Sequence, residues 1–200
     1  MYGIYDGSSV IARFVVPMTV RSNHPVFASD TLSLNRQISR RSAQRWEIET
    51  QLEPLSISAQ DLFVDIVTKG YSGAVQVITP QNYGAVRART ASGSGSATVA
   101  GTMGQSMVAL SGVSGFIPKG TFIKFSNSSK VYMTTSDRTG PGSVGIYPNL
   151  IANSSGADTV RFLDDVIMTC SYDLDTVTGM TYQDGILMDV GTIKLIERLP

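Results

Sequence analysis

The sequence predicts an α+β protein that is mostly β, with one packed α-helix. Charged residues make up only 16% of the 200 residues. Gly, Ser and Thr fill the deficit, and these residues favour turns and strands over helices. Many short strand candidates lie close together, which favours a barrel or a sandwich. Helical spacing of apolar residues is convincing at only one place.

The clearest strand signal lies at residues 45–53. Apolar or uncharged residues alternate there with acidic or polar ones: Trp46, Ile48, Thr50 and Leu52 against Glu47, Glu49, Gln51 and Glu53. Period-two alternation predicts a strand with one packed face and one wet or paired face. We therefore expect Trp46 and Ile48 in the core.

The predicted helix spans residues 59–69. Ser58 is a suitable N-cap, and Gly70 is suited to the position just past the last turn. Leu62, Phe63 and Ile66 recur at helical spacing. The helix should lie across a sheet, with these three residues in the core.

The remaining chain divides into short strands and loops. Residues 17–25 are loop-like, and 81–96 form a flexible Gly/Ser-containing loop or linker. Further strands are predicted at 9–16, 31–38, 73–79, 107–111, 121–125, 130–135, 143–147, 160–163, 166–173, 185–189 and 192–197.

Charge and composition exclude several classes of partner. Basic and acidic side chains number 16 each, whereas a phosphate-binding surface needs a basic excess, so no nucleic acid is expected as the main partner. No stretch reaches the ~18 apolar residues of a membrane helix, and no secretory signal is evident. The single cysteine, Cys170, is expected to be a buried apolar residue.

Residues suited to catalysis are few. The only histidine, His24, lies in a loop-like segment beside Pro25, without a recognisable nucleophile motif near it. A Cys/His zinc site is excluded by count, because structural sites need about four such ligands. We expect a protein that is no enzyme and has no cofactor and no small-molecule substrate.

Carboxylates leave two alternatives open. Asp164, Asp165, Asp173 and Asp175 could offer oxygen ligands to calcium or could be solvated strand ends, and the EF-hand pattern is absent. Glu47 and Glu49 share one face of a strand at a spacing that could serve a glycosidase. The aromatic residues that line such a groove are, however, only 8% of the chain. We expect no metal site.

Two segments and their order resemble the minor tail and distal tail-type proteins of tailed bacteriophages. The first runs from Arg45-Trp46-Glu47-Ile48-Glu49 through Leu52-Glu53-Pro54-Leu55, the helix 59–69 and the strand 75–79. The second runs from Val113 to Phe125, with Gly120-Thr121 where such proteins usually have Gly-Asp, and continues through Lys130-Val131-Tyr132-Met133 to Leu150. The closing segment 191–198 is similar to their last strand.

The resemblance implies a fold and a domain division. A tail-tube-like β-sandwich or barrel core would use residues 1–80 and 165–200, and a small β-barrel at 97–164 would be inserted. The 81–96 segment would connect the two parts.

The resemblance also implies a role. The chain would be a structural protein of the virion, in the tail or baseplate, present in the host cytoplasm during assembly. It would form a ring with itself, commonly a hexamer, and bind other tail and baseplate proteins. Candidate patches for the subunit interface are Arg36, Arg40, Arg41 and Arg45 on one side and Asp164, Asp165, Asp173 and Asp175 on the other. The alternative is a receptor- or glycan-binding module of the tail tip that uses Tyr132, Tyr147 and Phe116.

Overall fold

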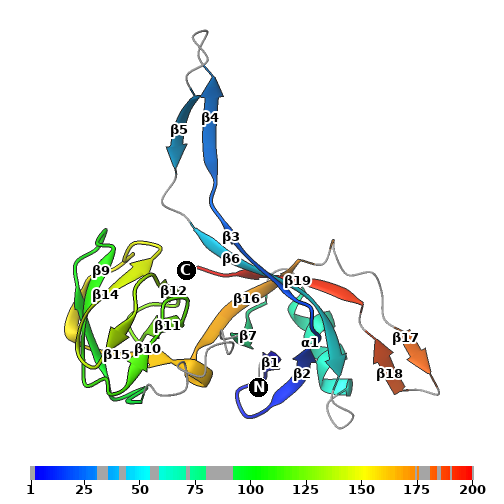
Figure 1. The fold of residues 1–200 in the computed structure, drawn as a ribbon. Coiled ribbons are helices and arrows are strands. Elements are labelled where there is room, and N and C mark those ends of the chain that lie inside the picture. The colour runs from blue at the N-terminus through cyan, green and yellow to red at the C-terminus, as the bar shows by residue number, and fades with distance from the viewer. Residues whose placement is uncertain are drawn as a thin grey trace.

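The computed structural model describes residues 3–30, 36–40, 44–54, 59–70, 73–79, 92–173, 175, 181–183, 186–189 and 191–199. Over these residues the chain forms a seven-stranded sheet, a closed six-stranded barrel and one α-helix (Figure 1). The prediction of a mostly β fold with one helix and a β-barrel is confirmed.

The sheet uses strands from both ends of the chain. They are β1 (Gly3–Tyr5), β2 (Val10–Phe14), β3 (Thr19–Asn23), β6 (Arg45–Pro54), β7 (Val75–Ile78), β16 (Ile167–Asp173) and β19 (Thr192–Glu197). Their order is β19-β16-β7-β1-β2-β6-β3, and β19 also pairs with β6. This additional pairing brings the two sides of the sheet together, so the strands curl around a shared apolar core.

The barrel lies in the chain between β7 and β16. Its strands are β8 (Thr98–Gly101), β9 (Met107–Ser111), β11 (Phe122–Phe125), β12 (Val131–Thr134), β14 (Gly142–Tyr147) and β15 (Ser154–Phe162). A short pair, β10 (Phe116–Ile117) and β13 (Arg138–Thr139), lies beside it. Alternate residues of each strand fill the interior, as in β9, where Val108 and Leu110 are buried and their neighbours exposed.

The helix α1 (Ala59–Lys69) has the predicted bounds. Gly70 follows it with a φ of 46°, which suits the position just past the last turn, and its N–H bonds to Ile66 O at 3.1 Å. Leu62 and Ile66 are buried, but Phe63 remains 39% exposed, so the prediction of Phe63 as a core residue is wrong. The buried face of the helix is therefore narrower than predicted, because only two of the three predicted core residues pack against the sheet.

Two hairpins lie outside the sheet and the barrel. The first, β4 (Val26–Asp30) with β5 (Arg36–Arg40), follows β3 and leads into β6. It extends well beyond the body and is called the arm below (Figure 1). The second, β17 (Thr181–Gln183) with β18 (Ile186–Asp189), lies beside α1, away from the barrel (Figure 1).

Strand β3 corrects one sequence prediction, and arm strand β5 bears on a second. Residues 17–25 were expected to be a loop, yet they contain β3, which pairs with β6 along Thr19–Asn23. Most β3 side chains are exposed, so the strand carries little apolar pattern and depends on backbone pairing. Of the strand expected at 31–38, residues 36–38 lie in β5, and residues 31–35 lie outside the described part.

Candidate functional site

The seam between sheet and barrel is centred on Trp46 of β6. Its side chain is 4% exposed, and its Nε1–H donates to Val131 O at 2.8 Å on barrel strand β12. The indole packs edge-to-face on Phe122, with ring centroids 5.1 Å apart, and on Tyr147, at 6.1 Å. One strand of the sheet thus inserts its largest side chain against the outer wall of the barrel.

Strand β12 serves as a wall shared by both cores. Val131 and Met133 face outward and pack with the apolar cluster of the sheet. Tyr132, between them, points into the barrel, stacks on Phe125 at a centroid distance of 4.9 Å, and accepts a hydrogen bond from Ile151 N–H. Burial raises the pKa of Tyr132. The period-two geometry of a strand therefore lets β12 pack on both sides.

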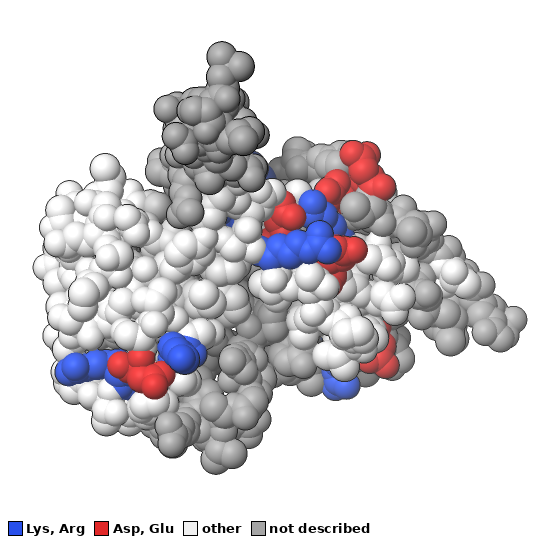
Figure 2. All heavy atoms as spheres, turned by 45° about the horizontal axis from the view of Figure 1, so that its top comes forward, with Lys and Arg blue, Asp and Glu red and all other residues white. Residues whose placement is uncertain are grey.

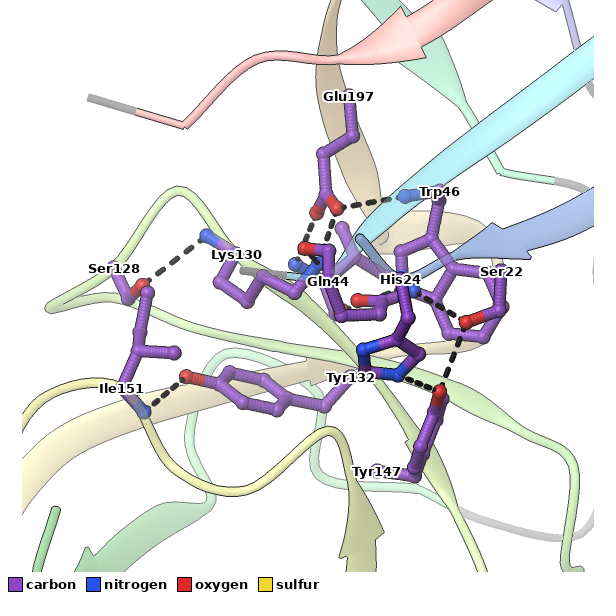
Figure 3. A network of polar contacts seen from close by, with 11 residues as sticks. Ser22, His24, Gln44, Trp46, Ser128, Lys130, Tyr132, Tyr147, Ile151 and Glu197 are labelled. Carbon is purple, nitrogen blue, oxygen red and sulfur yellow. Dashed lines mark hydrogen bonds and ion pairs between the residues drawn. The ribbon is translucent and has the colours of Figure 1, made fainter. Parts of the chain in front are cut away.

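A buried ion pair joins Lys130, directly before β12, to Glu197 at the end of β19 (Figure 3). The two side chains are 1% and 0% exposed. Glu197 also accepts hydrogen bonds from Val131 N–H at 2.9 Å and Trp46 N–H at 3.1 Å. Lys130 Nζ donates to Gln44 O at 3.1 Å. Burial lowers the pKa of Lys130, and the charge of Glu197 opposes that shift.

A second polar chain connects β3 with β14 across the same seam (Figure 3). His24 Nε2 and Tyr147 Oη share a hydrogen bond, and Tyr147 Oη lies 3.0 Å from Ser22 Oγ. Gln44 Nε2–H donates to Ser22 Oγ at 3.0 Å. His24 was expected in a loop-like segment, and it is half-buried against the barrel at the base of the arm. These contacts hold the end of β3, at the base of the arm, against β14.

The acidic face of β6 is paired with cations of neighbouring strands. Arg21 lies 3.3 Å from Glu49, and Lys194 lies 3.2 Å from Glu47 and 3.7 Å from Asp173. Burial alone would raise the pKa of Glu47, but hydrogen bonds from Asn23 and Lys194 lower it overall. Figure 2 shows blue and red side chains adjoining one another on the sheet, whereas most of the barrel face in this view is uncharged. The acidic side chains of β6 are therefore paired with basic side chains of the neighbouring strands.

The described arginines predicted for a subunit interface lie on arm strand β5 and at the start of β6. Arg36 and Arg40 are the first and last residues of β5, and Arg45, at the start of β6, has an exposed side chain. Arg41 lies outside the described residues. The fold thus places the described arginine positions on one strand line that leads from the arm into the sheet.

The four predicted interface acids do not form one patch. Asp164 and Asp165 lie in the 3₁₀ turn η2 (Leu163–Asp165), where the chain leaves the barrel. Asp173 and Asp175 lie at the other end of β16, and Asp173 is paired with Lys194. At about 3.3 Å per residue, β16 separates the two pairs by roughly 25 Å. The four acids are close in sequence but not in space, because the extended strand β16 separates the two pairs. The prediction of a single acidic patch is therefore wrong.

Sequence reasoning missed Lys130 and Glu197, although one signal was present. Ile193, Leu195 and Glu197 share one face of β19, and the first two are buried. A carboxylate in register with buried apolar residues indicates a buried, partnered charge. Which cation it meets could not be read from the pattern.

The fold and this seam define a class: a mostly β protein in which a closed barrel is fixed to a curled sheet by a buried polar network. No family model matches the chain, and no curated protein matches it.

No described helix has the length and apolarity needed to cross a membrane. Within the described ranges, no three His, Cys, Asp or Glu side chains gather as a metal site would require. Burial raises the pKa of the Cys170 thiol, which is fully buried.

Proposed function

We propose that this chain is a structural component of a bacteriophage tail, a ring-forming adaptor that joins the tail tube to the baseplate. The resemblance of residues 45–79, 113–150 and 191–198 to minor tail and distal tail-type proteins motivates the proposal. On this reading the seven-stranded sheet is the tail-tube-like core and the barrel is its insertion.

The observation that carries the proposal is the arm. Its two strands pair only with each other among the described residues. A lone two-stranded hairpin is at best marginally stable in water, and its open edges are templates for another strand. An arm of this kind is stabilised when a neighbouring subunit adds a strand or a packing surface to it.

The base of the arm is bound to the barrel by several contacts, which suits a role in assembly. Asn23 pairs with Arg45 where β3 and β6 enter the arm, and Trp46 and His24 bind this base to the barrel. Because a closed ring needs heterologous contacts, one surface of a subunit must meet a different surface of the next. The arm, with Arg36, Arg40 and Arg45 along one strand line, is our candidate for the projecting surface.

The test compares the full chain with a variant in which residues 26–40 are replaced by an Asn-Gly turn. Light scattering would give the mass of each protein alone and mixed with tail-tube protein. We expect the full chain to form a closed ring, or to assemble on the tube, and the armless variant to stay monomeric with unchanged far-ultraviolet circular dichroism. A full chain that is monomeric and indifferent to tube protein, or an armless variant that assembles equally well, would refute the proposal.

The glycan-binding alternative has less support. Tyr132 is fully buried inside the barrel, and Tyr147 is committed to Trp46 and His24 at the seam. Phe116 is half-buried in the short strand β10. These three aromatic side chains therefore do not line a shared open site for a sugar ring.

A further inference from the structure

A polar pocket opens between the barrel and the sheet. Its volume is about 550 Å³. Gln76 and Thr169 of the sheet form one wall, and Lys124 and Arg161 of the barrel form the other. The turn Ser126–Ser129 lies along its rim. Both parts of the fold contribute to it, so it exists only when barrel and sheet are docked.

The barrel wall of this pocket carries two cations side by side. Lys124 of β11 and Arg161 of β15 are direct partners in the antiparallel register. Their neighbours Ile123, Phe125, Val160 and Phe162 are buried in the barrel, so the alternation of the strands directs both cations outward. Like charges directly opposite each other on a sheet destabilise it. The repulsion between Lys124 and Arg161 therefore destabilises the fold locally, and a bound anion would offset it.

No carboxylate of the described part forms an ion pair with either cation. Lys124 Nζ donates to Ile167 O at 2.7 Å, which leaves two of its N–H groups for another acceptor. Asp165 lines the pocket but lies beyond ion-pair distance of both cations in the described structure. Glu197, whose charge acts on Lys124, is already bound to Lys130. Burial lowers the pKa of Lys124, as expected for a cation without a close counter-ion.

Hydroxyl groups on the rim can complete an anion site. Ser129 Oγ is buried and has no hydrogen-bond partner among the described residues. Ser126 Oγ accepts a hydrogen bond from Thr159 N–H at 3.0 Å and keeps its own proton to donate. Two cations with at least two hydroxyl donors form the donor set that binds carboxylate and phosphate oxygens.

We propose that this pocket binds an oxyanion, a carboxylate or a phosphate, carried on a small polar molecule. Lys124 and Arg161 hold its charge, and Ser126 and Ser129 donate hydrogen bonds to it. The site is independent of the tail role, because it depends only on the docked barrel and sheet.

The test uses the full chain and three ligands at constant ionic strength: sodium phosphate, sodium glucuronate and glucose, with sodium chloride and acetate as references. Amide chemical shifts and thermal unfolding would be followed for the wild type, Arg161→Gln, Lys124→Met and the control Arg13→Gln. Arg13 is an exposed arginine on β2 that does not line the pocket. We expect phosphate or glucuronate to shift the amides of residues 126–129 and to raise Tm above the chloride reference.

Each pocket substitution should weaken that binding roughly tenfold or more, since a charged hydrogen bond is lost, whereas Arg13→Gln should not. Arg161→Gln should also raise the Tm of the anion-free protein, because it removes the repulsion from Lys124, an effect that a merely structural arginine would not show. Glucuronate binding above acetate identifies an acidic sugar, and phosphate binding above both identifies a phosphate group. Shifts no larger than with chloride, or binding retained in Arg161→Gln, would overturn the proposal.

Discussion

Lys130 Nζ and the Glu197 carboxylate form a fully buried ion pair that joins the barrel to the last strand of the sheet. The carboxylate also accepts the N–H groups of Trp46 and Val131, one from each part of the fold. A single side chain therefore satisfies three donors at the seam. Replacing it with a neutral amide leaves a buried cation without its counter-ion and turns one of the two acceptor oxygens into a donor.

Glu197→Gln should therefore destabilise the protein strongly. Breaking a buried pair by removing one partner costs about 3–5 kcal/mol. Urea unfolding followed by circular dichroism would measure this loss. Glu53→Gln is the matched control, because Glu53 is an exposed strand residue and its substitution should change stability by no more than about 0.5 kcal/mol. A Glu197→Gln loss as small as that of the control would contradict the account of the seam.

Trp46→Phe should loosen the seam while leaving most of the apolar packing. The substitution deprives Val131 O of its donor at 2.8 Å, and an unsatisfied buried group costs about 1–3 kcal/mol. Phe63→Leu, on the exposed side of α1, is the control for an aromatic change away from the seam. Equal losses of unfolding free energy in the two variants would argue against Trp46 as the anchor.

Tyr172→Phe should weaken the contact between β16 and α1. Tyr172 Oη–H donates to Asp65 Oδ2 at 2.8 Å, and a hydrogen bond to a charged group contributes about 1.5–3 kcal/mol. Burial, followed by the charge of Asp65, raises the pKa of Tyr172, so its phenol should not ionise before the protein unfolds in alkali. Tyr5 is the control: its exposed hydroxyl donates to Gly7 O, so Tyr5→Phe should cost less. Ultraviolet titration and urea unfolding together would check both statements.

The ionised carboxylate of Asp6 should stabilise the folded protein, and this stabilisation should be lost only at low pH. The N–H groups of Ser9 and Ser8 and the Ser8 hydroxyl donate to its carboxylate and lower its pKa to about 2. Since the folded pKa lies below the unfolded value, near 3.9, this stabilisation is complete above about pH 4 and disappears as the pH falls through 2. Carbon-detected NMR titration of the carboxyl group would check it. A pKa near 3.9 in the folded protein would refute the turn geometry.

Local patterns were enough to find most secondary structure. Helical spacing with Gly70 at its end located α1, and alternation at 45–53 located β6, because both signals depend on residues a few positions apart. The exposed strand β3 escaped, since its pairing with β6 leaves little apolar pattern in its own sequence. The sequence predicted that Trp46 lies in a core. It did not indicate that this core is shared with the barrel.

What the sequence by itself determined is the mostly β class, the single helix and the inward residues of its strands. What only the tertiary structure decided is which of these residues meet. Lys130 and Glu197 are 67 positions apart, and the adjacency of Lys124 and Arg161 depends on strand register in the closed barrel. The physical reason is that alternation specifies which face a side chain occupies, whereas its partner depends on long-range pairing that brings distant strands together.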